Sequence, residues 1–258
     1  MNLIEEYQQQ QTWRNWSQYL KEIPFRKEDR IVDLGCSVGG VSNILSKQVA
    51  LVTGIDSNSD FINYCLSSAQ PNQNFICNEF TKINYALLSP LNGIWSSFAL
   101  SYLKEPSALL KSLFETLQPN GWISLVDVSL FISGNMLPEC KHYEQVKKFE
   151  IESAIRGVYD FDFGSKMESV LKQIGFEIIH VNNNVTDPEL NFNGVASPKI
   201  LATWKIRLDR MQGLQRKFPE VYSEIVQEIT ASLMSEKHSK NNNVRFVVAK
   251  KNLTKSLH

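Results

Sequence analysis

The sequence predicts a doubly wound α/β fold: a mostly parallel seven-stranded sheet with helices on both faces and a helical insertion between the last two strands. Two observations carry this prediction. Between residues 30 and 127, short β-rich runs alternate with longer segments of helical periodicity, which is typical of a parallel sheet covered by helices. The strand pattern then recurs once, stops after residue 181, and resumes only at residue 243.

The first half of the chain contains five β-rich runs separated by turns or helical segments. The expected strands are Arg30–Leu34, Leu51–Ile55, Asn74–Cys77, Gly93–Ser97 and Trp122–Asp127. The expected helices are Val41–Lys47, Ser59–Ala69 and Ser107–Leu117. Before them, Trp13, Trp16 and Leu20 have helical spacing, which predicts an amphipathic helix over Gln8–Leu20 that either packs on the domain or covers a ligand.

The second half predicts a helix, a strand, the insertion and a last strand. Gly164–Ile174 has a helical pattern and Phe176–Val181 is β-rich, as is Asn243–Lys250. In the insertion, apolar residues recur at helical spacing from Ile200 to Met211, and a second helix is expected to begin near Pro219. We therefore divide the chain into an N-terminal helical cap (1–27), an α/β domain (28–182 and 243–252) and a helical insertion (183–242).

Composition excludes several classes of protein. The chain has 258 residues, 27 basic and 27 acidic, so its net charge of zero disfavours a dedicated nucleic-acid binder. The N-terminus lacks a basic segment followed by an apolar run, and the longest apolar stretch, Ile123–Ile132, is too short to span a bilayer. The four cysteines show no C-x-x-C spacing, so we expect a cytoplasmic protein with reduced thiols and no metal site.

The most informative segment is Ile31–Gly40, an apolar strand that runs into a glycine-rich turn and a helix. Such a turn brings backbone close to a ligand at a helix N-terminus. Its G-x-x-x-G-G spacing differs from the G-x-G-x-x-G that accommodates a pyrophosphate, so a dinucleotide is disfavoured. Asp56 ends the next strand, 23 residues after Asp33, where a carboxylate can hold a ribose diol.

These two elements are similar to those of class I S-adenosylmethionine-dependent methyltransferases, whose first motif resembles V-D-L-G-x-x-x-G and whose second strand ends in an acid. The likeness continues at Cys77–Phe80, Gly93–Leu100 and Leu117–Trp122, and it covers about residues 28–182. It departs at Glu79, where the family usually has an aspartate. The resemblance implies a Rossmann-like methyltransferase fold and S-adenosylmethionine as the cofactor.

The resemblance also implies roles for individual residues. Gly35, Ser37 and Gly39 would line the methionine moiety. Asp56 would hold the ribose, and Glu79 with the backbone of Phe80 would contact the adenine. The remaining expected cofactor contacts are Asp33, Ser57 and Ser97. Purely structural roles stay open: Asp33 as a brace of the turn, Asp56 as a plain loop acid and Glu79 as a solvated side chain.

Catalytic residues are less clearly marked, because a methyl group on a sulfonium needs mainly an aligned acceptor and not necessarily a base. Tyr102 follows the fourth strand and His142 follows the fifth, at the strand ends where open α/β sheets bind ligands. A packed or solvated side chain is the alternative for both. His180 is expected to be structural, and Asp160 and Asp162 are expected to cap the following helix or to meet a cationic substrate.

We therefore expect a methyltransferase that acts on a small molecule, with the insertion and the N-terminal helix closing over the acceptor. Residues 199–258 carry 12 basic against 5 acidic residues, so an RNA or protein methyltransferase that docks through this region is an alternative. A non-catalytic S-adenosylmethionine-binding protein is another. No membrane partner is expected, and the protein is expected to be a monomer or homodimer.

Overall fold

The computed structural model describes residues 2–252 and contains the predicted seven-stranded sheet, with strand order β3-β2-β1-β4-β5-β7-β6. The strands are β1 (Arg30–Leu34), β2 (Leu51–Asp56), β3 (Gln73–Cys77), β4 (Leu91–Ser97), β5 (Leu117–Val128), β6 (Glu177–Asn182) and β7 (Val244–Lys250). Strands β1 to β5 pair in parallel, and β7 is antiparallel to both β5 and β6. This arrangement confirms the Rossmann-like methyltransferase fold.

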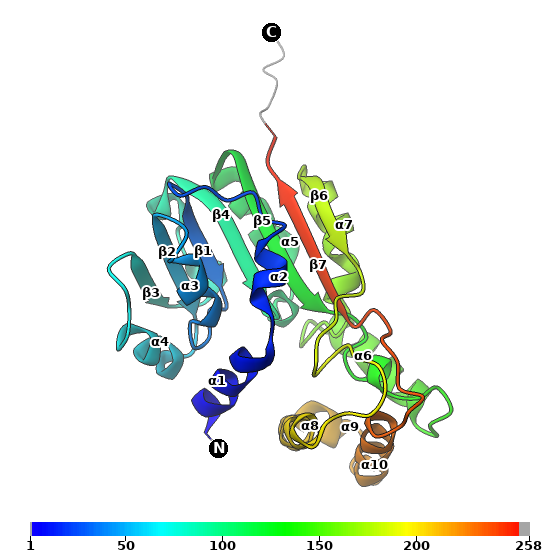
Figure 1. The fold of residues 1–258 in the computed structure, drawn as a ribbon. Coiled ribbons are helices and arrows are strands. Elements are labelled where there is room, and N and C mark those ends of the chain that lie inside the picture. The colour runs from blue at the N-terminus through cyan, green and yellow to red at the C-terminus, as the bar shows by residue number, and fades with distance from the viewer. Residues whose placement is uncertain (1, 253–258) are drawn as a thin grey trace.

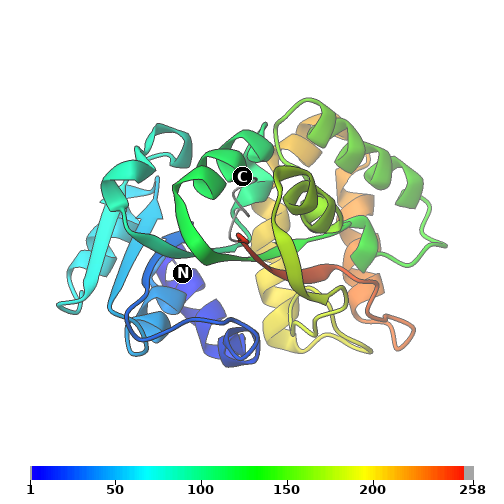
Figure 2. The same cartoon turned by 90° about the horizontal axis from the view of Figure 1, so that it is seen from above.

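Helices cover both faces of the sheet (Figures 1 and 2). Helices α5 (Pro106–Thr116) and α7 (Phe163–Ile174) pack on one face, and α2 (Trp16–Leu20) and α3 (Gly40–Leu45) lie on the other. Helix α4 (Ser59–Leu66) contacts the β2–β3 edge of the sheet. The two faces form separate apolar cores, as expected for strands that are buried on both sides.

The N-terminal segment forms two helices, so the single helix predicted over Gln8–Leu20 is wrong. Helix α1 (Leu3–Trp13) ends where Arg14 adopts an extended backbone, and α2 follows at Trp16. The break has a tertiary cause, because Trp16 packs edge-on against Trp95 of the sheet while the Arg14 side chain reaches the insertion. Sequence periodicity does not report either contact.

The insertion between β6 and β7 is helical, as predicted, and lies beyond the carboxyl ends of the parallel strands together with α1 (Figure 1). It contains α8 (Pro198–Arg210), α9 (Gln212–Lys217) and α10 (Tyr222–Leu233). Ser197 caps α8 by accepting a hydrogen bond from the N–H of Ile200. Pro219 lies in the turn before α10 and does not begin that helix, contrary to the prediction.

Helix α6 (Tyr143–Ile155), which packs beside the insertion, was not anticipated, and neither was the short α9. The buried face of α6 includes the charged Glu150, which interrupts the apolar pattern. The Glu150 carboxylate accepts hydrogen bonds from the N–H groups of Ile132 and Ser133 and from the Ser133 hydroxyl, and burial raises its pKa to about 7. Glu150 is therefore buried in order to bind the loop after β5, and its presence on the buried face breaks the apolar pattern that would have predicted this helix.

The acids before α7 also differ from the expectation. Asp162 is the N-cap residue, but its carboxylate accepts hydrogen bonds from the hydroxyls of Ser129 and Ser165, with no capping bond to the helix backbone. Asp160 pairs with Lys166. His180 has the expected structural role in β6, where its ring packs on Phe246.

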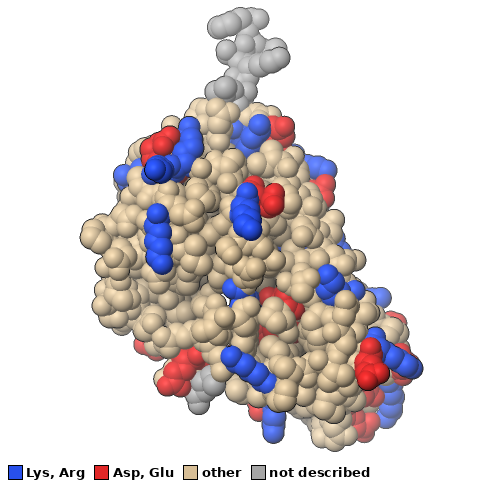
Figure 3. Space-filling view, viewed as in Figure 1, with Lys and Arg blue, Asp and Glu red and all other residues tan. Residues whose placement is uncertain are grey.

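Several basic residues of the C-terminal region form ion pairs. Arg207 pairs with Glu189, Arg210 with Glu6 and Lys217 with Glu152. On the face in Figure 3, lysine and arginine side chains are interspersed with acidic ones. The positive excess of this region therefore does not form a continuous basic patch on that face.

Close packing of α7 against β5 gives a prediction about stability. A Cβ atom at Gly164 would lie 2.6 Å from the Val128 carbonyl oxygen and 2.8 Å from that of Asp127. We expect Gly164→Ala to lower the free energy of unfolding in urea by about 1–3 kcal/mol, because backbone has to move. The control is Gly213→Ala in α9, whose Cβ would meet nothing closer than 3.7 Å and which should be neutral or stabilising. Equal effects of the two changes would contradict this account.

Candidate functional site

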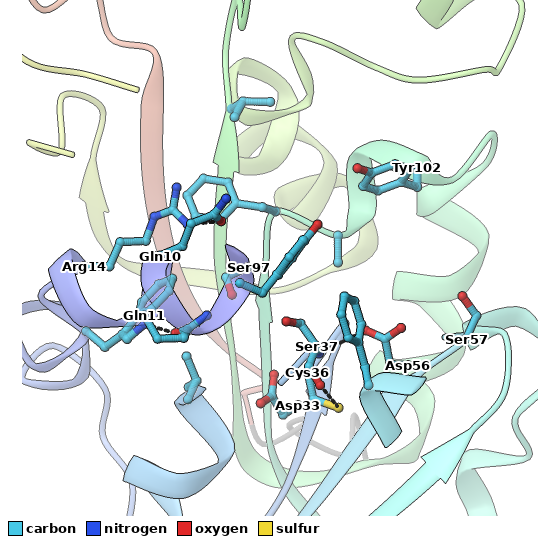
Figure 4. Close-up of a pocket in the computed structure, with 18 of the residues that line it drawn as sticks. Gln10, Gln11, Arg14, Asp33, Cys36, Ser37, Asp56, Ser57, Ser97 and Tyr102 are labelled. Carbon is cyan, nitrogen blue, oxygen red and sulfur yellow. Dashed lines mark hydrogen bonds between the residues drawn. The ribbon is translucent and has the colours of Figure 1, made fainter. Parts of the chain in front are cut away.

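A cavity of 290 Å³ lies at the carboxyl ends of β1, β2 and β4, under the N-terminal helix (Figure 4). The sheet register explains the convergence, since Leu34 at the end of β1 pairs with Ile55 of β2 and with Ser96 of β4. The loops that follow these three strands therefore begin at the same edge. This is the edge at which open α/β sheets bind ligands.

The glycine-rich turn forms one wall of the cavity. Gly35 has φ +75°, and a Cβ there would lie 2.5 Å from the Cβ of Ala99. Gly39 also has positive φ and is the N-cap residue of α3. Asp33, below the turn, accepts a 2.6 Å hydrogen bond from the Ser42 hydroxyl of α3. The turn thus needs glycine for its backbone, and Asp33 braces it while also lining the cavity.

Asp56 ends β2 and lines the cavity opposite α1. Its carboxylate accepts hydrogen bonds from the backbone N–H groups of Ser37 (3.0 Å) and Asn58 (2.9 Å). These two bonds fix the side chain between the glycine-rich turn and the start of α4. A carboxylate held at this place can accept hydrogen bonds from two adjacent hydroxyl groups.

The structure brings most of the predicted site residues together. Those that line the cavity are Asp33, Gly35, Ser37, Asp56, Ser57, Phe80, Ser97 and Tyr102. Three do not line it: Gly39, Glu79 and His142. Gly39 lies in the turn itself, at the N-cap of α3.

Glu79 and His142 lie elsewhere for clear reasons. Glu79 is exposed and pairs with Lys82 at 2.8 Å, so its role in adenine contact stays a prediction while Phe80 beside it does line the cavity. His142 is buried at the start of α6, where its Nδ1 lies 3.1 Å from Glu228 of α10. The structure therefore does not place His142 where a catalytic group could reach an acceptor in the cavity.

The N-terminal segment was expected to close over the site, but the sequence did not indicate which of its residues line the cavity. Tyr7, Gln10, Gln11 and Arg14 all line it, and the three labelled side chains, Gln10, Gln11 and Arg14, approach from that helix in Figure 4. Phe98, Phe131 and Arg207 are further wall residues that the sequence did not indicate. The only sequence signal was the apolar spacing of the first 20 residues, which did not distinguish a cover from simple packing.

Buried ion pairs fasten this cover to the insertion. Arg14 donates to Asp187 (2.9 Å) and to Glu189 (2.8 Å), and Glu189 also accepts from Arg207 of α8. Asp187 and Glu189 are buried almost completely. A second pair joins α1 to α8, between Glu6 and Arg210 at 2.6 Å. The cavity is thus closed by two segments that lie far apart in the sequence.

Titratable groups in the cavity differ from their usual states. Burial raises the pKa of Asp33 to about 7, against a usual value of 3.8. Desolvation raises the pKa of the Tyr102 phenol to about 12, although Tyr102 presents 64% of its surface to solvent and cavity. Tyr102 therefore stays protonated at neutral pH and can donate a hydrogen bond but cannot act as a base.

Two further features are absent from residues 2–252. No group of three or more histidine, cysteine, aspartate or glutamate side chains is arranged to hold a metal ion there. Within the same range, no helix has the length and apolar character needed to cross a membrane.

Comparison with known proteins identifies the class that this fold and site define. Residues 5–181 match a family model described as a methyltransferase domain, so the chain belongs to that family. The match covers the glycine-rich turn, Asp56 and α1. No curated protein sequence matches the chain.

Solved structures share the fold at low sequence identity. A putative methyltransferase from Bacillus halodurans has a TM-score of 0.60 at 12% identity, covering 93% of this chain and 99% of that one. An S-adenosylmethionine-dependent methyltransferase from Mesorhizobium loti has 0.54 at 15%, covering 91% and 96%. A mycolic acid cyclopropane synthase complexed with SAH (S-adenosylhomocysteine) and CTAB has 0.60 at 15%, covering 91% and 82%. Family and neighbours support S-adenosylmethionine as the cofactor.

The raised pKa of Asp33 predicts a pH dependence of stability. The folded protein holds this proton up to about pH 7 and the unfolded chain releases it near 3.8, so stability falls as pH rises between these values. Asp33→Asn removes this loss. In urea unfolding, the stability of the variant relative to the unmodified protein should increase by about 1.4 kcal/mol per pH unit from pH 4 to 7. A pH-independent difference would show that Asp33 titrates normally.

The buried ion pairs predict a large effect of removing their central cation. Arg14→Met leaves Asp187 unpaired and Glu189 with one partner in place of two, and we expect the free energy of unfolding to fall by about 3–5 kcal/mol. Arg216→Met in α9 is the matched control, because Arg216 is exposed and contacts only Gln212. A loss below 1 kcal/mol for Arg14→Met would mean that the cover is held by other contacts.

Proposed function

We propose that this protein is an S-adenosylmethionine-dependent methyltransferase whose acceptor is a small molecule. The observation that supports this proposal is a second cavity of 520 Å³, which shares wall residues with the first. Five residues line both: Tyr7, Tyr102, Phe131, Tyr159 and Arg207. Two adjoining cavities, one at the motif residues and one enclosed by α1, α6, α8 and α9, fit a cofactor and a small acceptor.

The residues of the first cavity fit this cofactor. Asp56 offers a fixed carboxylate to the ribose hydroxyls, and the strained turn at Gly35 presents backbone where the methionine moiety is expected. Asp33 and Ser97 supply further polar groups, and Phe80 supplies an apolar wall for the base. These groups suit a ligand made of a nucleoside and an amino acid, and the glycine spacing of the turn does not suit a pyrophosphate.

S-adenosylmethionine, held by Asp56 and the turn at Gly35, would supply an electrophilic methyl group for transfer to the acceptor, with S-adenosylhomocysteine as the other product. The chain itself orients the acceptor and excludes water. Residues lining the second cavity include no histidine, lysine, aspartate or glutamate. The cavity walls therefore offer no carboxylate, imidazole or amine as a base, and the chain contributes by orienting the acceptor.

A polymer acceptor is less well supported. Arg207 and Arg210 of the basic C-terminal region form buried or half-buried ion pairs with Glu189 and Glu6. The cover formed by α1 would also stand between an RNA or protein chain and the first cavity. These contacts favour a small acceptor that is enclosed during transfer.

Cofactor binding gives the direct test. Asp56→Ala should weaken binding of S-adenosylhomocysteine in calorimetry by more than tenfold, because each hydrogen bond to a charged acceptor is worth roughly 1.5–3 kcal/mol. Asp60→Ala is the matched control, since Asp60 is exposed in the first turn of α4 and does not line the cavity. NAD should not bind. Tight NAD binding without S-adenosylhomocysteine binding would refute the proposed function.

A further inference from the structure

The chemistry of the second cavity identifies a class of acceptor, an inference that rests on the proposed function. The cavity is bounded by α1, the segment between α6 and α7, and the junction of α8 and α9. Its walls combine a dense group of aromatic rings with two arginines.

The aromatic walls form a connected cluster. Tyr102 and Tyr159 lie edge to face at 4.7 Å between ring centroids, and Tyr159 contacts Phe161 at 4.6 Å. Phe161 in turn stacks against Phe131 and tilts against Phe149. Such walls favour a flat apolar or aromatic group, which gains both apolar burial and ring contacts.

The charged components of the walls are both positive. Arg207 and Arg210 are the charged side chains among the residues that line the second cavity. Their acidic partners, Glu189 and Glu6, are buried behind them and do not line it. A ligand in this cavity therefore meets guanidinium groups but no carboxylate.

Both guanidinium groups keep donors available. Arg207 donates to Glu189 through Nε and Nη2, and Arg210 donates to Glu6 through Nη2. Within residues 2–252, the Nη1 of Arg207 and the Nε and Nη1 of Arg210 have no hydrogen-bond partner. Fixed guanidinium donors beside aromatic rings are well suited to a carboxylate.

Charge balance limits how much negative charge the ligand can carry. The cluster that holds α1 to the insertion contains three arginines and three acids, so its net charge is already zero. Its members are Arg14, Arg207, Arg210, Glu6, Asp187 and Glu189. A ligand anion is therefore held by the free N–H donors of the two arginines and not by an excess of positive charge, and a doubly charged phosphate would add twice the uncompensated charge of a single carboxylate.

We infer that the methyl acceptor is a small aromatic or similarly flat apolar carboxylic acid, whose ring lies among Phe131, Tyr159 and Phe161 and whose carboxylate is held by Arg207 and Arg210. The arginines bind and orient this acid. They are positioning residues, because the methyl group is transferred to the bound acid and the guanidinium groups take no part in the transfer.

Matched pairs of acids and amides test this inference. The probes are benzoate against benzamide, 4-hydroxybenzoate against 4-hydroxybenzamide, and indole-3-acetate against indole-3-acetamide, titrated into the full chain saturated with S-adenosylhomocysteine. In at least one pair, the acid should bind more than tenfold tighter than the amide, because charge-assisted hydrogen bonds are lost in the amide. Equal affinities in every pair, or no binding of any acid at 10 mM, would overturn the inference.

Variants assign the preference to the two arginines. Arg210→Gln should reduce the acid-to-amide ratio to within about threefold, and Arg207→Lys, which keeps the charge but loses the fork, should reduce it as well. Arg216→Gln is the control and should keep the full ratio, since Arg216 does not line the cavity. A ratio unchanged in both arginine variants would overturn the assignment.

The affinity for S-adenosylhomocysteine, measured in the same samples, separates the two levels of the proposal. Normal binding shows that a variant is folded and that its cofactor site is intact. No binding by the unmodified protein would refute the proposed function itself. Normal binding without any preference for acids would refute only the acceptor class.

Discussion

Arg14 is the residue on which the closed site depends. Its guanidinium group is buried between the carboxylates of Asp187 and Glu189, so the segment before α2 cannot leave the insertion without exposing or stranding charges. Glu189 also pairs with Arg207, so the same cluster of ion pairs positions α8. The same few contacts therefore close the first cavity, orient an arginine of the second and hold the two halves of the site together.

Different parts of the chain form the two sides of this closed site. The parallel strands and their loops provide the family motif, with Asp33 bracing a turn and Asp56 fixed by two N–H groups. The cover and the insertion provide the remaining walls, and the insertion lies outside residues 5–181, which the family model matches. A single fold can serve many substrates when one part of its site binds a common cofactor and another part differs from protein to protein.

Strands and the cofactor edge were predictable from the sequence because they depend on local signals. Alternating runs mark β1 to β5, and the turn after β1 requires glycine at Gly35 for steric reasons. The ion-pair cluster was not predictable, since Arg14 meets partners 173 and 175 residues away. His142 failed as a site residue for the same reason, because Glu228 in a distant helix fixes the direction of its ring.

The position of β7 has a consequence for how the chain reaches this structure during synthesis. β7 lies between β5 and β6, yet it is the last strand along the chain. While the insertion is being made, β6 has no neighbour in the sheet, and both cores lack the apolar residues Phe246 and Val247. An emerging chain must therefore hold an open sheet edge until β7 arrives, and during that interval it is most exposed to mispairing and to binding by chaperones.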